Sequence, residues 1–162
     1  MIDKKIKATQ AKILRLKKAL AADKRFWGGE YHDGGGVRYL LPAQYIKIKD
    51  YKGGLRYVNW FNKNFPDDTA HAIFLFEWTF ILFKCGKLNE AKQKLLLTLE
   101  SNKFLFDVFL ERDLSELTEE EVSSWEFKSL SSAFSYTYND VEFLEFYYWV
   151  KKILKNVVDG EA

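Results

Sequence analysis

Two stretches decide the fold of this chain: LPAQYIKIKDYKGGLRYVNWFNKNFP at residues 41–66 and WTFILFKCGKLNEAKQKLLLT at residues 78–98. They align at a shift of 37 positions, which places Leu41 over Trp78. In each stretch we expect an apolar helix, a tight turn, and a second helix with a small residue, Gly54 or Ala91, in its first turn. We expect these second helices at residues 51–64 and 88–101. Repeats of about this length are typical of stacked helical hairpins, which bury a continuous core only against their neighbours.

The rest of the chain also favours helices, and no segment shows the alternation of a strand. Residues 69–84 are apolar almost all round, as in a helix that is covered on several sides. Thr118 and Glu121 form the pattern of a capping box, so we expect a helix to begin after Thr118. Residues 129–138 leave helix and loop open as alternatives. We predict a single all-α domain over residues 1–162, with an N-terminal helix at 3–25, repeat-like units at 35–71 and 72–105, and a C-terminal helical cap at 106–158.

Matching positions in the two units carry a resemblance to a known family. The first repeat-like unit holds Leu41, Tyr45, Tyr51, Gly54 and Pro66, and the second repeat-like unit holds Gly86, Leu88, Ala91, Leu95 and Thr98. This pattern resembles the tetratricopeptide repeat, with departures at Phe61, Trp78 and Lys103. Residues 51–68 are also similar to bacterial repeat proteins to which we attach no activity. The resemblance implies stacked hairpins that bind another protein or a peptide and carry out no catalysis.

The same resemblance implies a partner-binding groove along the first helix of each unit. It would be lined by Tyr39, Ile46, Lys47, Ile73, Phe76, Phe80, Phe83 and Lys84. An aromatic groove of this kind suits an amphipathic helix or an apolar peptide. The alternative is that the flanking helices cover these residues and make them ordinary core.

Charge is distributed unevenly along the chain. Residues 1–25 carry a balance of +7, and residues 101–149 carry eleven acidic residues against three basic ones, a balance of −8. We name as the acidic face Glu111, Asp113, Glu116, Glu119, Glu120, Glu121 and Glu126. Such a face favours a second function, that of an inhibitor or immunity-type protein which masks a basic partner. It also argues against nucleic acid as the partner.

Few residues suggest chemistry. Glu30, His32 and Asp33 share a glycine-rich loop, which leaves a small metal-dependent enzyme as another alternative, but three such residues so close together rarely complete a metal site. We expect no metal, no cofactor and no catalytic residue. Glu77 lies within an apolar helix and needs a partner, for which Arg38 is a candidate. Lys84 beside Cys85 would favour its thiolate mildly, but nothing around it suggests a catalytic base, so an incidental cysteine is the favoured interpretation.

Composition bounds the environment of the protein. Cys85 is the only cysteine, which excludes an internal disulfide and fits a reducing compartment. The most apolar run, residues 70–83, is too short to span a bilayer and contains Glu77. We find no secretory signal at the start of the sequence. These features predict a cytoplasmic protein that does not enter membranes, and a homodimer formed through an uncovered apolar edge is one further alternative.

Overall fold

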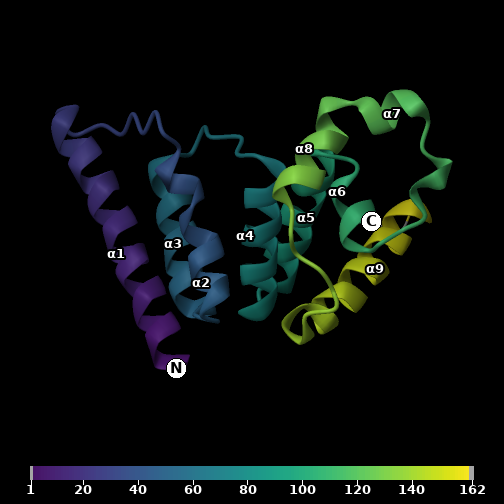
Figure 1. Cartoon of the computed structure of the whole chain (residues 1–162), viewed down its shortest axis with the longest axis horizontal. Coiled ribbons are helices and arrows are strands. Elements are labelled where there is room, and N and C mark those ends of the chain that lie inside the picture. Colours follow the sequence, from purple (N-terminus) through teal and green to yellow (C-terminus); the bar gives the residue numbers. More distant parts are fainter. Residues whose placement is uncertain (1, 161–162) are drawn as a thin grey trace. The chain divides into compact units, whose positions relative to one another are not determined.

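Helices form all the regular structure in residues 2–160, which are the residues that this computed structural model describes (Figure 1). Within them there are nine α-helices, three short 3-10 helices and no strand, so the prediction of an all-α protein is confirmed. The chain divides into two compact units. The first comprises the residues up to Thr69 together with Lys84–Lys87, and the second comprises Ala70–Phe83 and the residues from Leu88 onward.

The first unit contains three α-helices and one 3-10 helix. They are α1 (Ile2–Phe26), η1 (Val37–Tyr39), α2 (Leu41–Lys47) and α3 (Tyr51–Asn64). The bounds of α3 match the prediction because its end signals are local. The carboxylate of Asp50 accepts a hydrogen bond from the backbone N–H of Gly53 at 2.9 Å, and the chain leaves helical geometry before Pro66.

The first turn of α3 requires a glycine at position 53. A Cβ atom placed there would overlap the capping carboxylate of Asp50 and would come within 2.8 Å of a ring carbon of Tyr45. Tyr45 is itself buried against the hairpin, so its ring cannot move away freely. Gly54, the small residue predicted for this hairpin, is buried as well.

Helix α1, the purple helix at the N-terminal end of the chain (Figure 1), packs against α2. Thr9, Ile13 and Leu20 are buried, while most of its lysines are exposed. The basic charge of the N-terminal residues therefore lies on the outer surface of α1. Few acidic residues are present on α1 to pair with these lysines.

The second unit contains the remaining helices. They are α4 (Ala72–Lys84), α5 (Leu88–Ser101), α6 (Leu105–Phe109), η2 (Leu114–Glu116), α7 (Glu119–Ser123), α8 (Trp125–Ala133), η3 (Val141–Phe143) and α9 (Leu144–Val158). Helix α5 has its predicted bounds. Helix α4 begins three residues later than predicted, where Nδ1 of His71 accepts a hydrogen bond from the backbone N–H of Phe74 at 3.3 Å.

The core of the second unit is an aromatic cluster around α4. Phe76, Phe80, Phe109 and Phe146 are fully buried, and the rings of Phe80 and Phe143 stack with centroids 4.0 Å apart. Ala91 is also fully buried, as its place in a helical hairpin requires. Helices α4, α6 and α9 thus share one core, in which α4 is covered on several sides.

The segment between α6 and α8 is held mainly by local side-chain caps. Thr118 and Glu121 form the predicted capping box, with the Thr118 hydroxyl accepting from the backbone N–H of Glu121 at 3.1 Å. Asp113 caps η2 and Ser124 caps α8 in the same way. The cap at Ser124 explains why α8 starts at Trp125. The helix continues to Ala133, so residues 129–133 of the ambiguous segment 129–138 are helical.

Candidate functional site

The groove residues of the second unit are mostly interior. Phe76 and Phe80 have no exposed surface, because Phe143 and Phe146 cover them from η3 and α9. This is the covered arrangement that the sequence left open as an alternative. Phe83 is half-buried and packs against Phe146 with ring centroids 5.3 Å apart. Ile73 is also half-buried, but it lines a hollow at the surface.

The groove residues that belong to the first unit have separate surroundings. Ile46 is buried and Lys47 is exposed. The hydroxyl of Tyr39 donates to the carboxylate of Asp68 at 2.7 Å. Lys84 is half-buried, with its ammonium 5.4 Å from the centre of the Tyr51 ring. Within this unit the four residues therefore do not present one shared open surface.

The acidic face is exposed in nearly all its members. Glu111, Asp113, Glu116, Glu119, Glu120 and Glu126 are exposed, and Glu121 is half-buried. In the described part of the chain, the one ion pair that involves the face joins Glu121 to Lys103 at 3.7 Å. The hydrogen bond from Ser115 holds the pKa of Asp113 below its usual range. The exposure of these side chains makes the acidic face available to a cationic partner.

One large apolar residue that the sequence did not single out lies beside the acidic face. Trp125 is 82% exposed and follows directly after the Ser124 cap. It lies at the edge of a hollow of about 300 Å³, which we call the Trp125 hollow; its wall includes Ile73, Leu130 and Ala133. No local pattern in the sequence marked this residue, because the exposure of a tryptophan at the first position of a helix depends on how the core packs.

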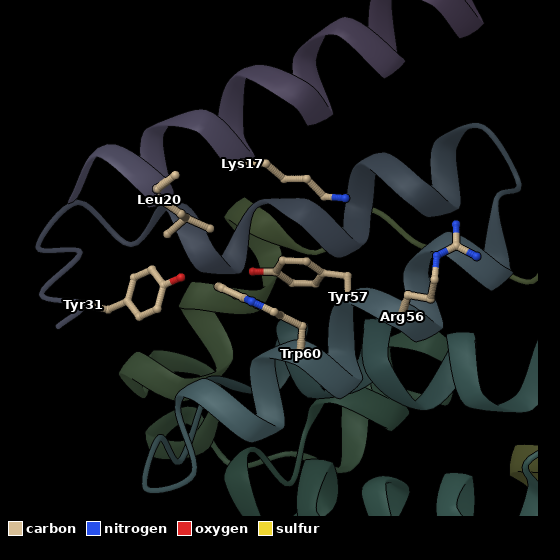
Figure 2. A pocket seen from close by; sticks show the side chains of 7 residues that line it. Lys17, Leu20, Tyr31, Arg56, Tyr57 and Trp60 are labelled. Carbon is tan, nitrogen blue, oxygen red and sulfur yellow. The ribbon is translucent and has the colours of Figure 1, made fainter. Parts of the chain in front are cut away.

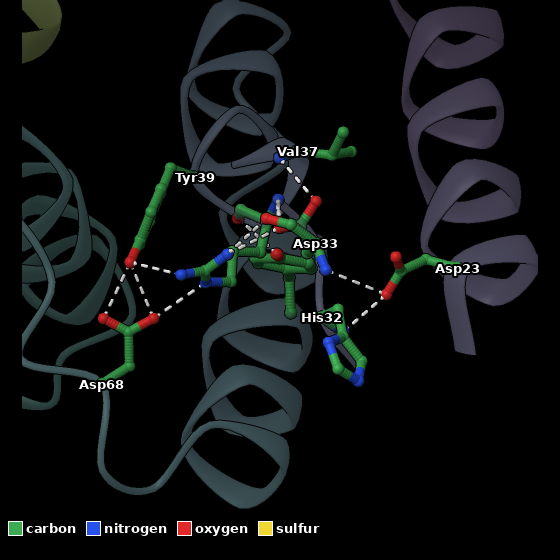
Figure 3. Close-up of polar contacts among 8 residues, drawn as sticks. Asp23, His32, Asp33, Val37, Tyr39 and Asp68 are labelled. Carbon is green, nitrogen blue, oxygen red and sulfur yellow. Dashed lines mark hydrogen bonds and ion pairs between the residues drawn. The ribbon is translucent and has the colours of Figure 1, made fainter. Parts of the chain in front are cut away.

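The glycine-rich loop is organised by Asp33, whose side chain is buried (Figure 3). Its carboxylate accepts hydrogen bonds from the backbone N–H groups of Val37 at 2.9 Å and of Arg38 at 3.0 Å, and it pairs with the Arg38 guanidinium at 2.9 Å. Arg38 also pairs with Asp68 at 2.8 Å. Burial acts to lower the pKa of Arg38, but the hydrogen bonds to Asp68 and Asp33 outweigh it and raise that pKa.

These contacts give the loop a structural role. Asp23 accepts from the backbone N–H groups of His32 and Asp33 (Figure 3). The imidazole of His32 stacks on the ring of Trp27 with centroids 4.0 Å apart. Among residues 2–160, no three His, Cys, Asp or Glu side chains gather where they could hold a metal ion. A metal site at Glu30–Asp33 would need Asp33 to leave Arg38 and both backbone donors.

The partner of Glu77 differs from the one expected. Glu77 is buried and accepts a hydrogen bond from the hydroxyl of Tyr136, which lies 59 residues further along the chain. Burial raises the pKa of Glu77 to about 7, and the hydrogen bond from Tyr136 opposes that rise. Arg38 was the wrong candidate because it is bound to Asp33 and Asp68.

The environment of Cys85 favours the incidental cysteine over the activated thiolate. Its Sγ atom donates to the backbone carbonyl of Tyr51 at 3.4 Å. Burial raises the pKa of this thiol, and the opposing effects of Lys87 and Lys52 are smaller. The thiol is therefore less reactive than a free cysteine at neutral pH.

No protein-family model, curated protein or solved structure matches this chain significantly. The tetratricopeptide resemblance therefore stays a prediction. Across residues 2–160, every helix is too short or too polar to cross a bilayer.

Proposed function

We propose that this chain is a protein-binding module of helical hairpins, without catalytic activity, that binds a basic partner through its acidic face and Trp125. The proposal keeps the tetratricopeptide-like arrangement as the type of scaffold. Between the two surfaces that the sequence suggested, burial of Phe76 and Phe80 favours the acidic face over the aromatic groove. An inhibitor that masks a basic cleft is one form that such a module takes.

The observation that carries the proposal is the exposure of Trp125. An indole ring that is 82% exposed leaves a large apolar surface in water. Tryptophan is among the residues that contribute most to protein interfaces when a partner buries it. The Trp125 hollow beside the ring has apolar walls formed by Ile73, Leu130 and Ala133, and it is large enough to receive an aliphatic or aromatic side chain.

Charge indicates which kind of partner fits. Glu116, Glu119 and Glu120 are exposed on one short segment and make no ion pair with the described residues. Like charges this close repel one another, and a partner rich in lysine or arginine removes that repulsion. A basic partner that also carries an apolar side chain is therefore complementary to the acidic face and to Trp125 at once.

The experiment uses a labelled amphipathic peptide of lysine and leucine as the probe. Its binding to the full chain is measured by fluorescence anisotropy. Replacing Trp125 by alanine should weaken binding by about 2 kcal/mol, or roughly thirtyfold. Trp125→Phe should restore much of that loss. Raising the salt from about 50 mM to about 300 mM should weaken binding further, because exposed charges are screened.

A matched pair of charge reversals separates the acidic face from overall charge. Glu119→Lys/Glu120→Lys changes the face, and Glu90→Lys/Glu100→Lys makes the same change at exposed positions of α5. Only the first variant should lose affinity, by about tenfold or more. Equal losses in both variants, or none in either, would contradict the proposal.

A second copy of this chain is one basic partner that the sequence itself supplies. The exposed lysines of α1 could meet the acidic face of another molecule. Sedimentation velocity decides this point. A dimer that Glu119→Lys/Glu120→Lys turns into a monomer would identify the partner as a second copy, whereas a monomer throughout leaves a different basic protein as the partner.

A further inference from the structure

The first unit has its own cavity, of about 430 Å³, between α1 and α3 (Figure 2). Leu20 and Ala21 of α1 form one wall, and Tyr57 and Trp60 of α3 form another. Tyr31, from the loop that follows α1, closes one end. This volume is within the range of pockets that hold small molecules, and it is separate from the acidic face, which lies in the second unit.

Three aromatic rings border the cavity. The rings of Tyr31 and Trp60 meet edge to face with centroids 5.5 Å apart, and those of Tyr57 and Trp60 lie 5.5 Å apart at 33°. Figure 2 shows the three rings converging from different parts of the backbone. Flat ring surfaces that enclose a space favour a flat apolar ligand, since such a ligand gains offset or edge contacts with each of them.

Two cationic side chains complete the lining. Lys17 comes from α1 and Arg56 from α3; both are exposed, and neither pairs with a carboxylate of the described residues. Among residues 2–160, no acidic residue lines the cavity. The nearby carboxylates are engaged elsewhere, because Asp23 binds two backbone N–H groups of the loop and Asp33 binds Arg38. The cavity thus has an unbalanced positive charge at its rim.

The hydroxyl of Tyr31 adds a polar group. It points toward Tyr57 and Trp60 (Figure 2) and makes no hydrogen bond with the described residues. Burial and the charge of Asp23 raise the pKa of this hydroxyl, so it remains a donor at neutral pH. The hydroxyl of Tyr57, by contrast, already donates to the backbone carbonyl of Arg38 at 2.5 Å.

We propose that this cavity binds a small aromatic anion, in which one flat ring system carries a carboxylate or a phosphate group. The ring contacts Tyr31, Tyr57 and Trp60. The anionic group meets Lys17 and Arg56 at the rim, where charge-assisted hydrogen bonds are stronger than those between neutral groups. The chemistry is shared by a nucleoside monophosphate and an aromatic carboxylate, and the experiment distinguishes them.

The test titrates the isotopically labelled full chain and follows its amide signals by NMR. Adenosine monophosphate and indole-3-carboxylate are the two probes. Adenosine and inorganic phosphate are the controls for the first, and indole and acetate are the controls for the second. At least one probe should cause saturable shifts at Lys17, Tyr31 and Trp60. Each control should bind at least about tenfold more weakly than its parent probe, because it lacks either the charge or the ring. The better probe identifies the source of the anion.

Paired variants test the cations. Lys17→Gln/Arg56→Gln removes both from the rim, and Lys18→Gln/Lys63→Gln removes the same charge from exposed positions on the same two helices. The first variant should bind the better probe about tenfold more weakly or worse, and the second should bind it as the wild type does. Tyr31→Phe should weaken binding by a smaller factor. Equal affinity in both double variants, or no saturable shift with either probe below about 5 mM, would overturn the proposal.

Discussion

Replacing Glu77 by glutamine should remove a large pH dependence from the stability of the second unit. The pKa of Glu77 rises from 4.5 to about 7 in the folded protein because the carboxyl is buried. Between these values the folded state holds a proton that the unfolded state releases. Raising the pH through this window therefore lowers the free energy of unfolding, and the loss is complete above about pH 7.

The magnitude follows from the same two values. A pKa difference of one unit corresponds to about 1.4 kcal/mol. The rise of Glu77 from 4.5 to about 7 thus predicts a fall of about 3 kcal/mol in the free energy of unfolding between acid and neutral pH. Glu77→Gln keeps the shape and polarity of the side chain but cannot ionise, so its own contribution should not change with pH.

Urea unfolding of the wild type and of Glu77→Gln between about pH 4.5 and about pH 8 measures this effect, because ionisable groups elsewhere cancel in the difference. The wild type should lose about 3 kcal/mol relative to the variant as the pH rises. Tyr136→Phe is a useful companion, since loss of its hydrogen bond should raise the pKa of Glu77 further. The reasoning is refuted if the difference between wild type and Glu77→Gln is flat, or if ¹³C NMR gives Glu77 a titration midpoint below about pH 5.

Three further predictions test other parts of the fold. Ala91→Trp should destabilise the protein by about 1–3 kcal/mol, because Ala91 is fully buried between packed helices; an unchanged thermal melt would count against the hairpin at α4 and α5. Arg38→Met should cost about 3 kcal/mol by leaving the buried carboxylate of Asp33 without its cation, whereas Arg56→Met, at an exposed position, should cost little in chemical denaturation; equal costs would refute the role assigned to Arg38. Cys85 should react with iodoacetamide at pH 7.5 more slowly than a free cysteine does, and a faster reaction would contradict the raised pKa of its thiol.

Signals confined to a few neighbouring residues predicted the helices well. Helix α3 follows from the cap at Asp50 and the break before Pro66, and α7 follows from the capping box at Thr118. Helix α4 begins at Ala72 and not at residue 69, because Nδ1 of His71 provides the cap, and histidine is a less common cap than serine, threonine, aspartate or asparagine.

The contacts that decide the candidate sites depend on residues far apart in the sequence. Tyr136 reaches Glu77 across 59 positions, and Asp68 reaches Arg38 across 30. No residue close in sequence to Phe76 or Phe80 predicts that η3 and α9 cover them. The acidic charge was visible in composition, but the exposure of Trp125 depends on which apolar side chains the core has already accommodated, and periodicity alone does not determine that.

The all-round burial of α4 has a consequence for synthesis of the protein. Helix α4 ends at Lys84, yet Phe143 and Phe146, which cover Phe76 and Phe80, are made roughly sixty residues later. At about 5–20 residues per second, a nascent chain carries this apolar helix for several seconds before its cover has emerged. During that interval α4 is the segment most exposed to association with neighbouring chains and the one that a ribosome-associated chaperone would be expected to hold.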